Sequence, residues 1–323
     1  YRPLKGFLPR CQYLSSSLSS TISTGLSEKL LKKFSQGSDM AMMESKISPK
    51  EFVIIRDIVK ERTGIYIRDS RSDYLEYRLK DRMLATGIHS FEEYYYFLKY
   101  SPGTSGELQS LINLITVQET SFFRNPDQLK SFQTAVLKEI LEKKNKSGHR
   151  SLRIWSAACS TGEEPLTLSI ILNEYLQYLF NWDVEILATD ISTRALDLAK
   201  KGNYDEQRFK DIPKELTEKY FTQTNGGYMA KETLTRLIKH LHMNLTSDFE
   251  KNLIISKQKM DVIFCRNVFI YFPDEVKEKI TEGFYNVLNP GGYLFLGNAE
   301  SIDIRKIPFK MTFMPGGMVY QKP

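Results

Sequence analysis

Apolar residues recur at helical spacing from about residue 47 onward. Phe52, Ile55 and Val59 fall at positions i, i+3 and i+7, so they share one face of a helix. Three later stretches repeat this period, with apolar stripes formed by Leu75, Leu79 and Met83, by Phe91, Tyr94 and Leu98, and by Leu108, Leu111 and Ile115. Four amphipathic helices joined by short polar links predict a small all-α domain, which we assign to residues 44–122.

Beyond about residue 150 the pattern changes to short apolar runs that alternate with amphipathic stretches. Predicted strands and helices alternate over residues 152–156, 163–180, 184–189, 193–201, 262–265, 274–288 and 293–296. This order is typical of parallel strands joined by helical crossovers. Two final apolar runs flank Pro315-Gly316-Gly317, which predicts a terminal hairpin. We therefore expect an α/β domain over residues 123–323.

The alternation lapses between residue 203 and about residue 239. Asn225-Gly226-Gly227 is a strong turn signal, and it is flanked by Tyr220, Phe221 and Tyr228. Aromatic residues on both sides of a tight turn favour a hairpin. We therefore expect a small antiparallel β-subdomain inserted into the α/β domain.

Residues 1–43 differ in composition from the rest of the chain. They include the run SSSLSSTIST and carry six Lys or Arg against two Asp or Glu, so +4 of the chain's net charge of +6 lies there. Such a segment is typical of a disordered tail, and an Arg/Ser-rich transit peptide is the alternative. The remaining chain is nearly neutral, which argues against a nucleic-acid partner.

The sequence also excludes several classes of protein. No apolar run approaches the roughly 18 residues that a membrane span requires. The three cysteines are widely spaced and odd in number, which matches neither a disulfide framework nor a zinc site. We expect a cytoplasmic protein without a metal and without a membrane-inserted part.

The stretch between Arg153 and Leu168 holds the richest candidate chemistry. A predicted strand leads into six consecutive small residues, 156–161, then a glycine and a helix. Small side chains let the backbone approach a ligand at the edge where doubly wound sheets bind nucleotides, which favours an adenosyl moiety. The spacing is not that of a dinucleotide fingerprint. Thr161 and Glu164 have the spacing of a capping box, so Glu164 either caps the helix or contacts the ligand.

Polar residues also follow two other predicted strands. Asp190 follows residues 184–189, where an acid commonly accepts hydrogen bonds from ribose hydroxyls, although a local turn acid is the alternative. Asn267 and Tyr271 follow residues 262–265 and would face the same edge. Asn267 could contact the ligand and Tyr271 could orient a substrate. Alternatively, Asn267 starts a helix and the residues around it belong to the core. The small-residue loop and Asp190 together indicate nucleoside binding, and they leave a hydride cofactor possible.

Two further groups allow a structural or a functional interpretation. Phe122, Phe123 and Arg124 precede Asn125-Pro126, which has the pattern of a helix N-cap followed by the first helical residue. The two aromatic rings either pack between domains or cover a cofactor. A second group, Arg71, Arg78 and Arg82, shares one face of the second helix, either as a solvated surface or as a docking surface for an acidic helix.

Five motifs, taken in order, resemble the CheR family of chemotaxis receptor methyltransferases: SFFRNPDQL, RIWSAACSTGEEP, ILATDIS, FCRNVFIYF and GGYLFLGNAES. The resemblance covers about residues 47–321. It implies an all-α N-terminal domain, a Rossmann-like domain dependent on S-adenosylmethionine, and a small inserted antiparallel β-subdomain. The implied activity is transfer of the methyl group of S-adenosylmethionine to glutamate side chains of chemotaxis receptors, with S-adenosylhomocysteine as product.

The resemblance also implies site residues. The implied cofactor contacts are Gln118, Thr120, Arg124, Glu164, Asp190, Asn244, Leu245, Arg266 and Asn267. Arg124 and Tyr271 are similar to residues at the methyl-transfer point, and the arginine face would dock the receptor. Gln118 stands where family members often have Asn, and GNAES replaces the commoner GHSES. The inserted hairpin is shorter than in members that bind a receptor-tail pentapeptide, so we expect a pentapeptide-independent, monomeric enzyme.

A glutamate acceptor explains why the sequence shows no Ser/His/Asp or Cys/His constellation. Its carboxylate has a pKa of about 4.3, so it is ionised at neutral pH and needs no general base. The site must instead align the reacting atoms. Two other functions stay open on the residues alone: a nucleic-acid methyltransferase, and a signalling module that binds the adenosyl compound without transferring a methyl group.

Overall fold

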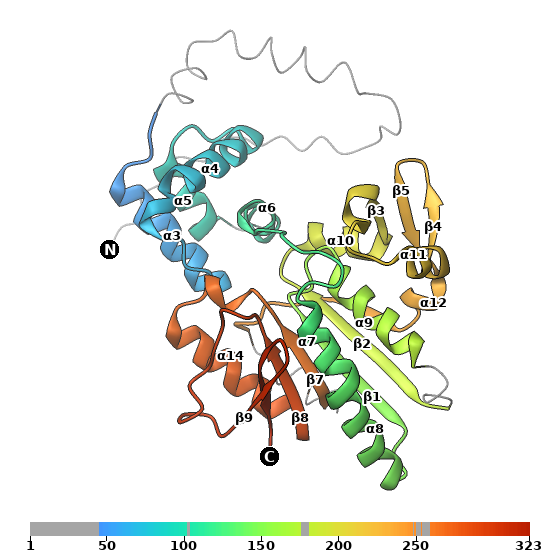
Figure 1. The fold of residues 1–323 in the computed structure, drawn as a ribbon. Coiled ribbons are helices and arrows are strands. Elements are labelled where there is room, and N and C mark those ends of the chain that lie inside the picture. Colours follow the sequence, from blue (N-terminus) through green and yellow to red (C-terminus); the bar gives the residue numbers. More distant parts are fainter. Residues whose placement is uncertain (1–44, 102–103, 176–180, 248, 250–252, 254–258) are drawn as a thin grey trace. The chain divides into compact units, whose positions relative to one another are not determined.

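A computed structural model describes residues 45–101, 104–175, 181–247, 249, 253 and 259–323 (Figure 1). From Lys46 to Pro323 the chain forms one compact unit. The tail expected over residues 1–43 lies outside the described residues. Within the described ranges, no helix combines the length and the apolar character needed to span a bilayer.

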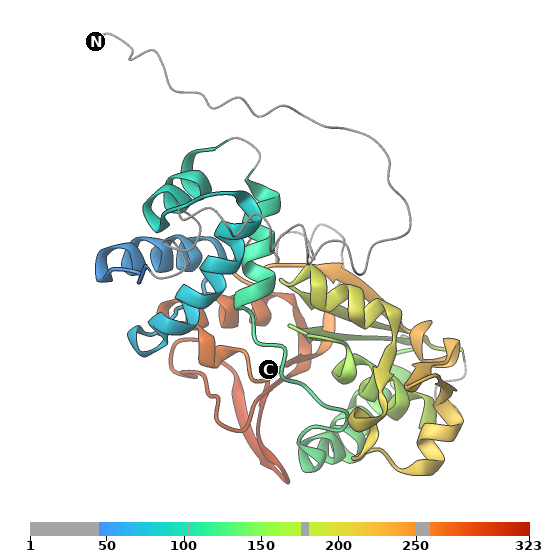
Figure 2. The same cartoon turned by 90° about the horizontal axis from the view of Figure 1, so that it is seen from above.

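Four α-helices among the described residues form the helical domain: α3 Pro49–Thr63, α4 Ser72–Thr86, α5 Phe91–Tyr100 and α6 Ser105–Ile115. The predicted stripes of α3, α4 and α5 are buried, whereas in α6 Leu108 is only partly buried and Ile112 joins the core. In Figure 2 these blue and teal helices gather together, apart from the golden strands of a small sheet. The boundary at residue 122 stays a prediction.

The end of α3 is fixed against the α/β part of the chain. The helix begins with a capping box in which Ser48 and Glu51 exchange hydrogen bonds, and it ends at Gly64, whose φ is 75°. A Cβ atom at Gly64 would lie 2.4 Å from Thr246 Cγ2. Glycine is therefore required at position 64 for two reasons: the left-handed backbone conformation and the close approach of Thr246.

In the part of the chain that the structure describes, seven strands form the main sheet in the order β6-β2-β1-β7-β8-β10-β9. The strands are β1 Ser151–Ala157, β2 Asp183–Asp190, β6 Ile238–His242, β7 Met260–Cys265, β8 Leu288–Leu296, β9 Lys310–Met314 and β10 Gly317–Gln321. The first five are parallel, and β10 and β9 add the antiparallel hairpin that the chain end predicted. The Rossmann-like α/β architecture is thus confirmed.

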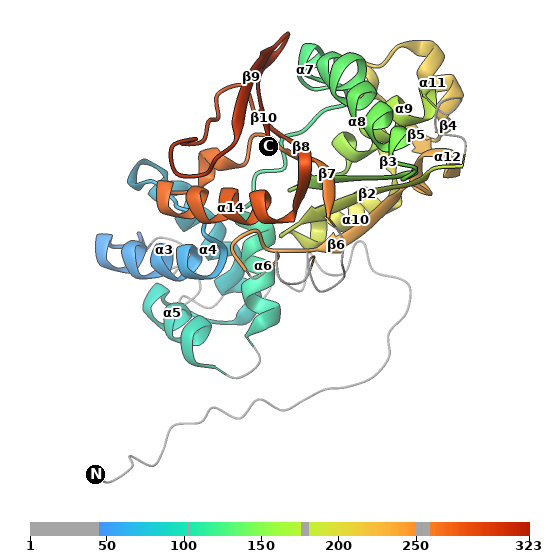
Figure 3. The same ribbon diagram turned by 90° about the horizontal axis from the view of Figure 1, so that it is seen from below.

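Helices cover both faces of this sheet (Figure 3). Ile154 and Trp155, neighbours in β1, belong to two different apolar clusters because successive strand residues point to opposite faces. The cluster of Ile154 includes residues of α8 Leu137–Lys146 and α9 Glu163–Glu174, and that of Trp155 includes α14 Asp274–Val287. Leu196 of α10 Thr193–Lys201 packs on Ala188 of β2.

A second sheet forms the inserted β-subdomain. Its strands are β3 Asn203–Asp205, β4 Phe221–Thr224 and β5 Gly227–Ala230, in the antiparallel order β3-β5-β4, with η4 Glu206–Phe209, α11 Lys214–Tyr220 and α12 Glu232–Thr235 beside them. The ring of Phe122 lies 5.2 Å from those of Tyr204 and Phe209 and 5.6 Å from that of Phe221. Of the two interpretations of this aromatic residue, packing between domains is the one that the contacts support.

One local prediction is confirmed in its position, and another is wrong in its bounds. Asn125 stands at the N-cap position of α7 Pro126–Ser131, but its φ is 58° and its side chain makes no capping bond. Its carbonyl instead accepts a hydrogen bond from the Gln128 N–H at 3.0 Å. The strand predicted from residue 293 begins at Leu288, because the Asn-Pro-Gly-Gly segment already belongs to β8. From α7 the chain runs through one π-helical segment, η2 Phe132–Val136, into α8.

Candidate functional site

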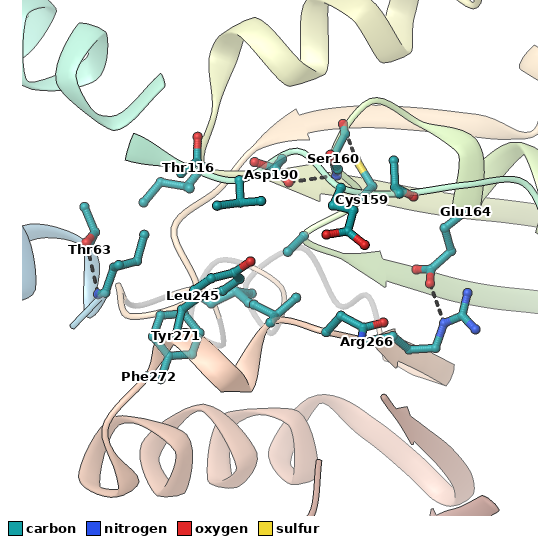
Figure 4. A pocket seen from close by; sticks show the side chains of 18 of the residues that line it. Thr63, Thr116, Cys159, Ser160, Glu164, Asp190, Leu245, Arg266, Tyr271 and Phe272 are labelled. Atoms are coloured by element: carbon teal, nitrogen blue, oxygen red, sulfur yellow. Dashed lines mark hydrogen bonds and ion pairs between the residues drawn. The ribbon is translucent and has the colours of Figure 1, made fainter. Parts of the chain in front are cut away.

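A cavity of about 990 Å³, counting space open to solvent, lies at the carboxyl ends of β1, β2 and β7 (Figure 4). β2 lies on one side of β1 and β7 on the other, so the order of strands reverses at this point, where doubly wound sheets bind ligands. The wall is completed by Thr63, the last residue of α3, by Ile65, and by residues 115–117 at the end of α6. The cavity is therefore lined both by the edge of the sheet and by the helical domain.

The small-residue loop after β1 forms one wall in a strained backbone conformation. Ala158 and Ser160 have φ values of 63° and 51°, and Gly162 has φ 98°. Left-handed backbone at residues other than glycine costs energy and persists only where surrounding contacts enforce it. The Cys159 N–H donates to the carbonyl of Thr189, and the Ser160 N–H donates to Asp190 Oδ2, each at 2.8 Å.

Glu164 points along the sheet edge and does not cap its helix. α9 begins at Glu163 after the left-handed Gly162, so Thr161 donates to Glu163 Oε2 at 2.6 Å. Glu164 Oε1 accepts from Ser156 Oγ at 2.6 Å, and Oε2 accepts from Arg266 Nε at 2.7 Å. The capping-box interpretation is therefore wrong, because the helix starts one residue later than that motif requires.

Arg266 connects three parts of the site. Besides Glu164, its guanidinium donates from Nη1 to the carbonyl of Arg124 at 2.7 Å and to Gln128 Oε1 at 3.2 Å. The side chain is 3% exposed, so these are the bonds of a buried cation. Arg266 thereby holds the segment that carries Arg124 against the end of β7.

Asp190 is a buried carboxylate with backbone partners on both oxygens. Oδ2 accepts from the Ser160 N–H and Oδ1 from the Ser192 N–H, both at 2.8 Å. The bond to the Ser192 N–H supports the interpretation as a local turn acid at the start of α10. Asp190 also lines the cavity, and its contact with a ribose stays a prediction. Burial raises its pKa, and the backbone bonds oppose that rise. Among the described residues, no lysine or arginine forms an ion pair with it.

Two buried polar atoms in the cavity wall have no partner. In the described ranges three buried side-chain N or O atoms have none, and two of these, Ser160 Oγ and Asn267 Oδ1, belong to residues that line the cavity. Asn267 has φ 61°, and its N–H donates to Glu300 Oε2 at 2.8 Å. Because buried polar atoms are nearly always hydrogen-bonded, these two indicate a place where a polar ligand binds.

Arg124 and Tyr271 lie on the more open side of the cavity. Arg124 Nη1 donates to the carbonyl of Glu119 at 2.9 Å, Nη2 lies 3.7 Å from Glu119 Oε1, and the side chain is 29% exposed. Tyr271, in the turn η5 Phe269–Tyr271, directs its ring into the cavity (Figure 4). Burial raises the pKa of its hydroxyl, so the hydroxyl stays protonated at neutral pH.

Most of the other expected cofactor contacts also line the cavity. Thr120, Asn244 and Leu245 do, but the Asn244 amide is already engaged, with Nδ2 donating to the Arg62 carbonyl at 2.8 Å and Oδ1 accepting from Thr246. A ligand contact from Asn244 would use its backbone or the second N–H of its side-chain amide. Gln118 does not line the cavity, and its amide donates to Ser192 Oγ at 3.3 Å. Its assignment as a cofactor contact is not supported by its position.

The arginines predicted to share a docking face differ in their contacts. Arg82 donates to both carboxylate oxygens of Glu107 in α6, at 2.9 and 2.5 Å, so it holds the helical domain together. Arg71 lies in the turn η1 Asp69–Arg71 before α4 rather than in the helix. Arg78 lies over the rings of Tyr74 and Tyr77. The predicted face is therefore reduced to Arg71 and Arg78.

Sequence reasoning missed the wall contributed by the helical domain and singled out no role for Ser160. Ser160 belongs to the small-residue run, so a signal for it existed. Thr63, Ile65 and residues 115–117 carry no motif, and they reach the cavity only because distant segments fold together. Among the described residues, no group of three or more His, Cys, Asp or Glu could hold a metal ion.

Comparison with known proteins matches both parts of the chain to one family. Residues 50–116 match the profile described as CheR methyltransferase, all-alpha domain, and residues 118–318 match CheR methyltransferase, SAM binding domain. The chain is 35% identical over 283 residues to chemotaxis protein methyltransferase 2 of Vibrio cholerae, which covers 87% of this chain and 96% of that protein. It is 35% identical over 258 residues to the chemotaxis protein methyltransferase of Borreliella burgdorferi, with 79% and 89% covered.

Comparison with solved structures also found matches. An rRNA methyltransferase from Streptomyces viridochromogenes matches with a TM-score of 0.39 at 10% identity, over 64% of this chain and 87% of that one. A likeness at this level carries no argument about the substrate of this chain.

Proposed function

Because both of its parts match the CheR methyltransferase family, the chain belongs to that family, and we propose that it methylates glutamate side chains of chemotaxis receptors. Membership makes the chain a methyltransferase that depends on S-adenosylmethionine. The receptor as acceptor is supported by the names of the relatives, which are chemotaxis protein methyltransferases. It is also supported by the geometry of the cavity.

The observation that carries the cofactor site is the pair of unpartnered buried atoms, Ser160 Oγ and Asn267 Oδ1, beside the carboxylate of Asp190. S-adenosylmethionine has ribose hydroxyls, an amino acid group and a sulfonium, so it offers both donors and positive charge. Asp190 can accept hydrogen bonds from the ribose and attract the cation. The residues present therefore fit this cofactor.

We assign the cofactor contacts to cavity-lining residues of the family motifs: Thr120, Arg124, Glu164, Asp190, Asn244, Leu245, Arg266 and Asn267. Ser160 joins this set because its hydroxyl is buried without a partner, and Gln118 leaves it because it does not line the cavity. Glu164 and Arg266 form an ion pair, so they present a neutral, rigid edge.

When bound, S-adenosylmethionine supplies a methyl group on sulfur; a glutamate carboxylate oxygen bonds to that carbon as the carbon–sulfur bond breaks, which yields a methyl ester and S-adenosylhomocysteine. The acceptor is ionised at neutral pH, so the chain supplies alignment and a site with little water. Arg124 presents N–H donors to the acceptor carboxylate, and Tyr271 donates a further hydrogen bond. The partial exposure of Arg124 lets an acceptor side chain reach it.

Receptor docking is proposed for the remaining arginine face, which is formed by Arg71 and Arg78. Receptor methylation helices that carry several glutamates are acidic, and charge complementarity would favour their encounter with this face. In the β-subdomain, β4 and β5 are four residues each and are joined by the tight turn at Asn225 and Gly226. So short a hairpin supports an enzyme that binds no free receptor-tail pentapeptide, and micromolar binding of such a peptide would contradict this.

Incubation of the full chain with methyl-labelled S-adenosylmethionine and receptor-containing membranes tests the function. We expect label on the receptor that alkali releases as methanol, because carboxyl methyl esters hydrolyse and N-methyl groups do not. Membranes without receptors, and DNA or RNA, serve as controls. Label on nucleic acid, or alkali-stable label on the receptor, would contradict the proposal, and cofactor binding without any labelling would indicate a non-catalytic module.

A further inference from the structure

The strained loop after β1 is held from two sides. On the side of the main sheet, Thr189 and Asp190 bind the N–H groups of Cys159 and Ser160. On the other side, the inserted β-subdomain binds Thr161, the next residue of the loop. Since left-handed residues persist only where their surroundings enforce them, both sets of contacts bear on the position of Ser160.

Arg208 and Tyr204 make the contacts from the β-subdomain. Arg208 Nη1 bonds to Glu163 Oε1 and lies 3.4 Å from Thr161 Oγ1, and Thr161 donates to Glu163 Oε2 at 2.6 Å. From β3, the Tyr204 hydroxyl donates to the Thr161 carbonyl at 2.8 Å. Thr161 is thus fixed through its side chain and its backbone by one small subdomain.

Burial gives the Arg208 contact its importance. The Glu163 side chain is fully buried, and among the described residues Arg208 is the cation that pairs with it. A buried carboxylate that loses its partner is strongly disfavoured, so without Arg208 the start of α9 would shift to expose Glu163. Thr161 would move with it, and so would the preceding residue, Ser160, which lines the cavity.

We propose that Arg208 and Tyr204 are positioning residues, through which the inserted β-subdomain fixes the cofactor-binding loop. Neither residue lines the cavity, so they act through Thr161 and Glu163. The inference rests on the proposed binding of S-adenosylmethionine in this cavity. It gives the insertion a role in cofactor affinity that is separate from any contact with the receptor.

The chain offers a matched control at the other end of α9. Lys219 of the β-subdomain pairs with Glu174, the last residue of α9, at 2.8 Å. Like the Arg208–Glu163 pair, this ion pair joins the β-subdomain to α9, but it comes from α11 rather than η4 and lies at the end of the helix that is away from the cavity. Replacement of Lys219 therefore weakens the attachment of the subdomain without touching the loop.

The test measures binding of S-adenosylhomocysteine by calorimetry to the full chain and to the variants Arg208→Ala, Arg208→Lys, Tyr204→Phe and Lys219→Ala. Steady-state methylation at varied S-adenosylmethionine gives KM and kcat. We expect Arg208→Ala to weaken binding and to raise the cofactor KM about tenfold, with kcat at saturation little changed. Tyr204→Phe should have a smaller effect of the same kind, Arg208→Lys should recover part of the loss, and Lys219→Ala should match the wild type.

Wild-type affinity in both Arg208→Ala and Tyr204→Phe would overturn the inference. So would an equal loss in Lys219→Ala, which would indicate general loosening of the subdomain. Should Arg208→Ala fail to fold, Arg208→Lys and Tyr204→Phe carry the test, because both retain most of the native packing. If the wild type itself does not bind S-adenosylhomocysteine, the proposed function fails rather than this inference alone.

Discussion

On the proposed cofactor half of the cavity, Arg266 and Asp190 are buried and the Glu164 side chain is 12% exposed, and each of the three has two or more fixed partners. On the proposed acceptor half, Arg124 is partly exposed and bonds to Glu119. The difference follows from what each half must recognise. A small cofactor is always the same molecule, so rigid preorganised partners suit it, whereas a protein side chain arrives on a large and variable surface.

Arg266→Ala should have the largest effect, and it tests whether the proposed cofactor half is rigidly held. It removes a buried guanidinium and leaves the Glu164 carboxylate, which is 12% exposed, without its cation. We therefore expect the free energy of unfolding to fall by about 3 kcal/mol in urea denaturation, the lower end of the range for a buried pair. Arg305→Ala removes an arginine that is 87% exposed and should change little. A loss below about 1 kcal/mol for Arg266→Ala would show that the cofactor half is not preorganised by this pair.

Arg124→Ala should give the opposite profile. The proposed role of this guanidinium is to orient the acceptor, and it contributes little to the fold. We therefore expect kcat/KM for the receptor to fall about a hundredfold. Its free energy of unfolding should change by less than about 1 kcal/mol. Methylation at the wild-type rate with normal cofactor affinity would contradict the proposed role of Arg124 in binding the acceptor. The variant Arg124→Lys tests whether a positive charge alone is sufficient.

Asp190→Asn tests how much the negative charge of this carboxylate contributes to cofactor binding. We expect about tenfold weaker binding of S-adenosylmethionine by calorimetry at neutral pH, because the anionic acceptor is lost. Burial raises the pKa of Asp190 above the usual value of about 3.9, so in the wild type the carboxylate is protonated, and affinity lost, at a higher pH than for an exposed aspartate. The Asn variant should not show this fall as the pH is lowered, and parallel profiles would count against the role of Asp190.

Tyr271→Phe should have the smallest effect. Loss of one hydrogen bond to the acceptor predicts turnover about fivefold lower, with the cofactor KM unchanged. Since burial raises the pKa of Tyr271 above its usual value of about 10, the wild-type rate should not decline through its ionisation between neutral pH and that value. A tyrosine-dependent fall of the rate in this range would show that the hydroxyl is less shielded than the structure indicates.

Periodicity was sufficient to predict the helices α3 to α6 and the alternation of strands and helices, because burial of one face imposes these spacings directly. The carboxyl ends of parallel strands meet at one edge, so the positions of Asp190 and Asn267 on the cavity also followed from the order of elements. These inferences need no knowledge of side-chain contacts between distant segments.

Glu164 and Arg208 show where the sequence is insufficient. Whether Glu164 caps a helix depends on the residue at which α9 begins, and the left-handed Gly162 decides that. Arg208 meets Glu163 across 45 positions of sequence, between an insertion and a helix, and no local pattern indicates such a partner. The amide of Asn244 is likewise occupied by the carbonyl of Arg62, 182 positions away.

The join between Arg62 and Asn244 is accompanied by a second one, in which the Tyr66 N–H donates to the carbonyl of Tyr271 at 2.9 Å. In hybrid enzymes that exchange the helices α4 to α6 between relatives, both bonds would therefore be preserved best if the exchanged piece began after Tyr66. With a crossover near residue 116, the two residues of each pair would come from different relatives. The contacts between the two parts of the hybrid would then be mismatched close to the cavity.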